Sequence, residues 1–150
     1  MQATEILKTE HRSIRRQMTE IACSAEAGRK DRFLVFKWEL ELHDAVETSV
    51  FYPAISLHPH TSRLAGMDVE ARRVVAKAMK SLESMPSNVT DWLPYFRAIK
   101  GILLRHIEDE ESDALEIIGQ ALTEDELNAL GDRMAQERRR LMVWERAPVL

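Results

Sequence analysis

The sequence has little of several residue types that would define a fold or a function. Cys23 is the single cysteine in 150 residues, which excludes a disulfide framework and the C-x-x-C zinc motifs. Five glycines and five prolines are too few for a collagen-like or a Gly/Pro-rich disordered chain. The longest run without a polar residue, Val50 to Ile55, is far too short to span a bilayer. We therefore expect a globular protein with Cys23 as a small buried hydrophobic residue.

An excess of one charge is absent as well. The chain has 21 Lys and Arg against 25 Asp and Glu, and the net charge of −4 gives no global reason to bind nucleic acid or an anionic membrane. Residues 1–16 carry charges throughout, with no apolar core and no small-residue cleavage site, so we expect no signal peptide. Apolar residues make up 45% of the chain, enough for one domain with its own core. We expect a single cytoplasmic domain over residues 1–150.

Glycines and prolines fall mostly between long segments of helical periodicity. The predicted helices run from about residue 3 to 28, 31 to 57, 68 to 85 and 90 to 119, and a shorter one begins at 123. Asp31 and Thr90 are plausible N-caps, and Thr123 with Glu126 forms a capping box. Pro53 should kink the second helix or end it early.

Each segment carries an internal stripe of residues spaced by three or four positions, and such stripes are buried when helices associate. The four stripes are Leu7, His11, Ile14, Met18 and Ile21; Phe36, Leu40, His43, Glu47, Val50 and Ala54; Ala71, Val75, Ala78, Leu82 and Met85; and Trp92, Phe96, Ile99, Leu103, His106, Glu110, Asp113 and Ile117. Four such helices with short connections predict an all-α protein, an antiparallel up-down four-helix bundle with an extra C-terminal helix.

The stripes contain polar residues where apolar ones are expected. His43 with Glu47, and His106 with Glu110, form two H-x-x-x-E pairs whose members lie on one helix face, and His11 adds a third imidazole. Burying two carboxylates is unfavourable by several kcal/mol each, and no Lys or Arg lies on the stripes to neutralise them. A bound cation explains the pattern better than a purely structural polar network. Imidazole and carboxylate ligands without thiolate favour iron or manganese, with zinc as a further option.

At these residues the chain resembles the hemerythrin-like, or HHE cation-binding, domain family. The resemblance rests on residues 10–12, on 43–53 with His43, Glu47 and the Phe51-Tyr52-Pro53 run, on 106–111, and on the tail 122–131. It implies an up-down bundle with a non-heme iron centre, usually two irons bridged by two glutamates. The implied ligands are His11, His43 and His106, with Glu47 and Glu110 as bridging or terminal carboxylates.

The third helix departs from the family pattern. Near its start the family supplies a further histidine, and the matching stripe position here is Ala71, which has no ligand atom. Glu70 and Asp44 are the candidate additional ligands, although Glu70 points about 100° away from the stripe. One iron, a weak second iron and a carboxylate-richer pair are all compatible with this sequence. The E-x-x-H pairs of ferritin-like proteins are excluded, because Leu40 and Leu103 stand at the glutamate positions.

We therefore predict a non-heme iron protein that binds, senses or responds to dioxygen or a related small oxidant. A metal-free bundle that acts as a structural or protein-interaction module and an iron-buffering protein are the alternatives, and a homodimer is left open. The His58-Pro59-His60 loop and the Arg138-Arg139-Arg140 run are interpreted as solvated surface.

Overall fold

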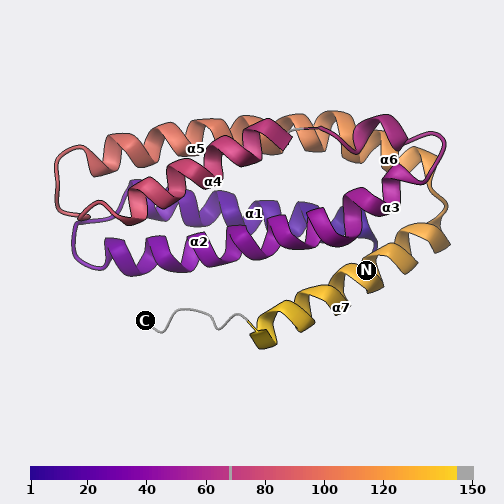
Figure 1. Ribbon diagram of the computed structural model, residues 1–150, viewed down its shortest axis with the longest axis horizontal. Helices are drawn as coiled ribbons and strands as arrows, with labels where there is room; N and C mark the ends of the chain where they lie inside the picture. The colour runs from indigo at the N-terminus through magenta and orange to yellow at the C-terminus, as the bar shows by residue number, and fades with distance from the viewer. Residues whose placement is uncertain (68, 145–150) are drawn as a thin grey trace.

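The computed structural model describes residues 1–67 and 69–144, which form helices joined by short turns (Figure 1). In chain order the elements are α1 (Ala3–Ala22), α2 (Arg29–Val46), the π-helix η1 (Glu47–Phe51), α3 (Tyr52–Ser56), the 3-10 helix η2 (Ser62–Leu64), α4 (Val69–Glu83), α5 (Trp92–Asp109), the π-helix η3 (Glu110–Leu115), α6 (Glu116–Ala121) and α7 (Glu124–Trp144). The described residues include no strand, which agrees with the predicted all-α class.

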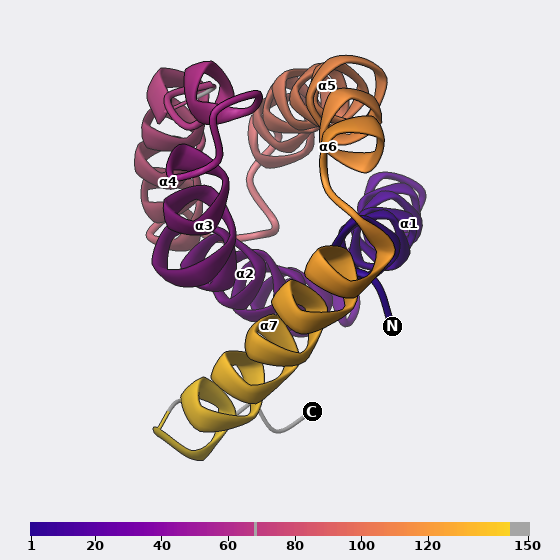
Figure 2. The ribbon, with the colours of Figure 1, turned by 90° about the vertical axis from the view of Figure 1, so that its right-hand side faces the viewer.

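Four long helices, α1, α2, α4 and α5, run up and down beside one another, and α3 and α6 extend α2 and α5 (Figure 1). In the end-on view these helices surround a common interior, and α7 lies outside them across α1 and α2 (Figure 2). The predicted antiparallel four-helix bundle with an extra C-terminal helix is confirmed. None of the described helices is long and apolar enough to cross a membrane.

The helix starts differ from prediction at two places. Gly28 adopts a left-handed conformation with φ of 77°, so the turn closes early and α2 begins at Arg29, ahead of the predicted cap Asp31. The fourth predicted helix begins at Trp92, two residues after Thr90. The capping box before α7 is confirmed, because the Thr123 hydroxyl accepts the Glu126 backbone N–H at 3.2 Å and the Glu126 carboxylate accepts the Thr123 N–H at 2.8 Å.

Both helices with an H-x-x-x-E pair change to a π turn directly at the glutamate. A π turn accommodates one extra residue, so the buried face moves on by one position. After Glu47, Ile55 is buried where Ala54 was expected. After Glu110, the buried residues are Ala114, Leu115 and Ile118, and the predicted stripe residue Asp113 is exposed. The helix itself continues through Pro53 to Ser56, with the irregularity immediately before the proline.

The buried apolar side chains form two clusters at opposite ends of the bundle. One cluster contains Ile14, Leu40, Leu103 and the aromatic group around Trp92, and the other contains Leu7 and residues next to α7. The buried polar residues between them include His11, His43, Glu47, His106 and Glu110. The bundle therefore has a polar layer between two apolar halves.

Two residues outside this layer correct or extend the sequence analysis. Cys23 is exposed at the end of α1, because the helix ends at Ala22 and the chain turns away from the core, so the prediction of a buried cysteine is wrong. Gly131 is buried where α7 packs against the first residues of the chain, just before α1. A methyl group there would overlap the main-chain carbonyl of Met1, so only glycine permits this close approach.

Candidate metal centre

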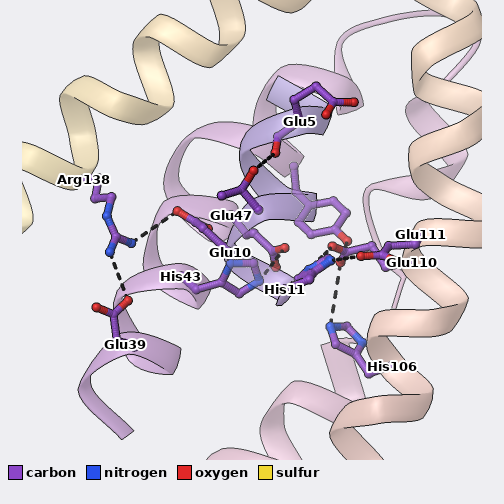
Figure 3. Close-up of polar contacts among 12 residues, drawn as sticks. Glu5, Glu10, His11, Glu39, His43, Glu47, His106, Glu110, Glu111 and Arg138 are labelled. Atoms are coloured by element: carbon purple, nitrogen blue, oxygen red, sulfur yellow. Dashed lines mark hydrogen bonds and ion pairs between the residues drawn. The ribbon is translucent and has the colours of Figure 1, made fainter. Parts of the chain in front are cut away.

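Four predicted ligand residues from four elements of the bundle converge within the polar layer. His11 of α1, His43 of α2, Glu47 of η1 and Glu110 of η3 each offer one ligand atom, and these atoms all lie within 4.8 Å of one another. His43 Nε2 lies 3.0 Å from Glu47 Oε1, and His11 Nε2 lies 3.2 Å from Glu110 Oε1 (Figure 3). His11, Glu47 and Glu110 are fully buried and His43 nearly so.

An outer carboxylate orients each of the two imidazoles. His43 Nδ1 lies 2.6 Å from Glu10 Oε2, and His11 Nδ1 lies 2.9 Å from Glu111 Oε1 (Figure 3). When Nδ1 donates to such a carboxylate, the proton stays on Nδ1 and Nε2 presents its lone pair. Both rings therefore direct Nε2, the atom that binds a metal once it carries no proton, into the cluster. Glu10 and Glu111 lie next to His11 and Glu110 in the sequence, within the stretches that carried the family resemblance, but their role was not predicted.

Each of the two outer carboxylates, Glu10 and Glu111, also forms an ion pair with an arginine. Arg138 of α7 reaches Glu10 at 3.3 Å and Glu39 at 3.0 Å (Figure 3). Arg15 reaches Glu111 at 3.2 Å. Arg138 is half-buried by these contacts, so the interpretation of residues 138–140 as a solvated run is wrong at its first member. Through Arg138, the C-terminal helix is connected to the polar layer.

The second oxygen of each central carboxylate faces other groups. The Tyr52 hydroxyl donates to Glu110 Oε2 at 2.6 Å, and Arg72 Nη1 donates to Glu47 Oε2 at 3.4 Å. The Arg72 guanidinium also stacks over the Tyr52 ring at 4.8 Å from its centroid. From the sequence, Tyr52 was noted within the Phe51-Tyr52-Pro53 run. Arg72 was not predicted to contribute, because it is off the apolar stripe and reaches the layer through its long side chain.

The other predicted site residues lie at the edge of this cluster or away from it. His106 is buried, with Nε2 3.8 Å from Glu110 Oε2, on the same side as Tyr52. Asp44 is half-buried. Glu70 is exposed and pairs with Arg73 at 2.6 Å, so the structure does not bring it into the layer.

A small cavity adjoins the cluster between the four long helices. Its polar lining comes from His43, Asp44, Arg72 and His106, its other lining residues are apolar, and Ala71 is one of them. The space suits about one water-sized molecule. The position where the family pattern has a histidine therefore borders open space beside the cluster.

The central groups have strongly shifted proton affinities. Burial raises the pKa of the Glu47 carboxyl to about 8, with a contribution from the charge of Glu110. Burial acts to raise the pKa of Glu110 too, but His11 and His43 outweigh it and hold that pKa well below its usual range. Burial acts to lower the pKa of His43, and the carboxylates of Glu47 and Glu10 outweigh it and raise that pKa well above its usual value. At neutral pH the cluster therefore holds protons in positions that a cation can take.

The donor atoms fit a metal ion. His11 Nε2, Glu47 Oε1 and Glu110 Oε1 are buried without a partner in hydrogen-bonding geometry, although they lie close together. With ligand bonds of about 2.0–2.2 Å, two donors on opposite sides of an ion lie about 4.0–4.4 Å apart. The donor atoms here lie within 4.8 Å of one another, so the largest separation would have to shorten by about 0.4–0.8 Å. Two imidazoles, two carboxylates and no thiolate form a donor set suited to a first-row transition metal.

Comparison with known proteins gives consistent results. The family model of the hemerythrin HHE cation binding domain matches residues 2–118. An uncharacterised hemerythrin-like protein of Schizosaccharomyces pombe is 27% identical over 93 residues, which is 61% of this chain and 46% of that protein, so the match spans less than half of that relative. The uncharacterised protein Rv2633c of Mycobacterium tuberculosis is 26% identical over 142 residues, which cover 90% of this chain and 84% of that protein.

A solved structure shares the fold. The crystal structure of a hemerythrin HHE cation binding domain-containing protein from Mycobacterium kansasii, a homologue of Rv2633c, superposes with a TM-score of 0.82. The superposition covers 99% of this chain and 95% of that chain at 24% sequence identity. Because the superposition reaches beyond residue 118, it includes the C-terminal helix α7 as well as the bundle.

Proposed function

This chain belongs to the hemerythrin HHE cation-binding domain family, and from that premise we propose that its polar layer binds non-heme iron and that the iron centre binds or senses dioxygen or a related small oxidant. Metal binding by the His/Glu cluster fits both the family and the geometry. The identity of the metal as iron, and the role toward a small oxidant, are the parts that we propose.

One observation carries the proposal. Four fully or nearly buried side chains direct His11 Nε2, His43 Nε2, Glu47 Oε1 and Glu110 Oε1 toward one another. Three of these atoms have no partner in hydrogen-bonding geometry, although neighbours lie 3.0–3.2 Å away. Buried polar atoms without partners are unfavourable by about 1–3 kcal/mol each, so a cation that satisfies them together stabilises the fold. We propose these four residues as the metal ligands, with His106 beside them.

The cavity beside the cluster supports the proposal that the centre binds a small ligand. The cavity has room for about one water-sized molecule, and its lining combines His43, Asp44, Arg72 and His106 with apolar residues that include Ala71. Iron supplies an electrophilic, redox-active site when it is bound. Ala71 keeps space open beside it, and the small size of the cavity admits a small molecule but not an ion with its hydration shell.

An iron-buffering protein uses the same ligands and differs in how tightly the metal is held. The full burial of Glu47 and Glu110 favours tight binding, because release of the metal leaves two buried carboxylates that Arg72 and Tyr52 compensate only in part. A metal-free interaction module is favoured by one observation, the ion pair of Arg72 with Glu47, which supplies part of the missing positive charge.

Elemental analysis after anaerobic loading with Fe(II) tests the proposal. We expect bound iron in the natural protein, loss of that iron in Glu47→Ala and Glu110→Ala, and a change in the optical spectrum when air is admitted. Glu108→Ala is the matched control, since Glu108 lies on α5 close to Glu110 but is exposed. Circular dichroism checks that each variant stays helical. Iron retained by both central variants, or no iron in the natural protein, would refute the proposal.

A further inference from the structure

The two oxygens of each central carboxylate have different surroundings. On one side, Glu47 Oε1 and Glu110 Oε1 face His43 and His11. On the other side, the Oε2 atoms face Arg72, Tyr52 and His106. Two metal ions bridged by a pair of carboxylates lie about 3.5–4 Å apart and use both oxygens of each bridge. A second ion would therefore have to bind on the Oε2 side.

Arg72 already supplies a positive charge on that side. Its Nη1 lies 3.4 Å from Glu47 Oε2, its guanidinium stacks on the Tyr52 ring, and its side chain is only 15% exposed. Tyr52 in turn holds Glu110 Oε2 at 2.6 Å. The stacking and the ion pair fix the guanidinium in place. Both Oε2 atoms are thus engaged by side chains of the protein itself.

The adjacent helix offers little to a second ion. Ala71 has no ligand atom, Val75 one turn later is buried and apolar, and Glu70 is exposed and paired with Arg73. His106 and Asp44 are the donor residues that line the cavity near this side, besides His43, whose Nε2 faces the first position. A second ion would therefore receive no ligand from α4 and would lie next to a guanidinium of the same charge sign.

The charges balance with one ion. One divalent ion together with Arg72 neutralises the carboxylates of Asp44, Glu47 and Glu110, whereas a second divalent ion would leave this buried region with an excess of positive charge. From this arrangement we infer that the centre holds a single metal ion, at His11, His43, Glu47 and Glu110, and that the Arg72 guanidinium takes the place of a second cation. This inference rests on the proposed function.

Removing the charge of Arg72 tests the inference directly. Arg72→Met keeps an unbranched, flexible side chain beside Tyr52 but removes the guanidinium and its charge, which opens a position with His106, Asp44 and two Oε2 atoms as donors. We expect one ion per chain in the natural protein and two in Arg72→Met, measured by elemental analysis with Fe(II) and by calorimetric titration with Zn²⁺, which is redox-silent. Arg72→Lys retains the charge and should stay at one. Arg73→Met is the matched control, because Arg73 is the exposed neighbour of Arg72 and should also stay at one.

The outcomes separate the inference from the proposed function. Two ions in the natural protein would overturn the inference and leave the proposed function intact, as would a single ion in Arg72→Met. No metal in the natural protein would overturn the proposed function and the inference with it. If Arg72→Met does not fold, Ala71→His in the natural background decides: with Arg72 present it should still bind one ion, and two would show that the guanidinium does not exclude a second.

Discussion

Replacement of Glu10 by glutamine should weaken metal binding although Glu10 does not reach the metal position. The Glu10 carboxylate accepts a hydrogen bond from His43 Nδ1 at 2.6 Å, and this bond directs His43 Nε2 into the cluster. Glutamine keeps the size of the side chain and removes its charge. The imidazole then loses both part of its basicity and the group that fixes its orientation.

Two independent considerations give the size of the effect. Substitutions in the outer shell of metal-ligating histidines weaken metal affinity by about 10–100-fold. Hydrogen bonds to charged groups contribute about 1.5–3 kcal/mol, and each tenfold in affinity corresponds to about 1.4 kcal/mol. The short distance and the low exposure of Glu10, 14%, place the bond among the stronger ones. We therefore expect Glu10→Gln to raise the dissociation constant by about 10–100-fold.

Titration against a competing chelator measures the affinity, with Glu39→Gln as control. Glu39 also contacts Arg138, at 3.0 Å, but makes no contact with a histidine, so its loss should change affinity by no more than about fivefold. Arg138→Ala should weaken binding only while Glu10 is present, since its effect passes through that carboxylate. Equal losses in Glu10→Gln and Glu39→Gln, or an undiminished effect of Arg138→Ala in the Glu10→Gln background, would refute this explanation.

Three further predictions concern the Tyr52–Glu110 hydrogen bond, the protons of the polar layer and the packing of α7. Tyr52→Phe removes the 2.6 Å hydrogen bond to Glu110 and should lower the free energy of unfolding by about 1–3 kcal/mol in urea titrations; an unchanged midpoint would contradict the assigned bond. Because the pKa of Glu47 is raised to about 8 and that of His43 lies well above its usual value, metal binding at pH 7 should release protons and strengthen as pH rises toward 8. Calorimetry in buffers of different ionisation enthalpy counts those protons, and zero release would show that the cluster is unprotonated. Gly131→Ala should destabilise the fold by about 1–3 kcal/mol in thermal unfolding, because the added methyl group meets the main chain of Met1; an unaltered melting temperature would mean that α7 shifts without penalty.

Most of the fold could be predicted from the sequence because long helices bury regular stripes. Leu7, Met18 and Phe96 are buried as their spacing indicated. The prediction failed where the regular period failed, at the π turns after Glu47 and Glu110. A regular period of 3.6 residues does not allow for the one extra residue of a π turn. The stripe therefore predicted that Asp113 is buried, whereas Ala114 is buried and Asp113 is exposed. Nothing in the local composition marks these turns, which depend on how the whole bundle closes around the layer.

The site could be predicted only as far as side chains on the stripes. His11, His43, Glu47 and Glu110 converge as expected, since internal positions of neighbouring helices meet at one level. Their roles as ligands stay predictions until metal is measured. Arg72 and Arg138 reach the layer from off-stripe positions on other helices, and a periodic pattern carries no information about where a flexible side chain ends. Tyr52 was hidden among core aromatics, because a buried ring gives no sign of where its hydroxyl points.

The polar layer between the two apolar clusters also bears on how the protein folds. The two clusters make separate contacts at opposite ends of the bundle, and the layer between them buries Glu47 and Glu110, whose charges a cation would neutralise. The proposed ligands extend from both halves: His11 follows Leu7 of one cluster and precedes Ile14 of the other. A bound ion would therefore couple two regions that could otherwise open separately, and its binding free energy would appear as cooperativity between them. In this family member, loading with metal would be the event that turns two locally stable ends into one unfolding unit.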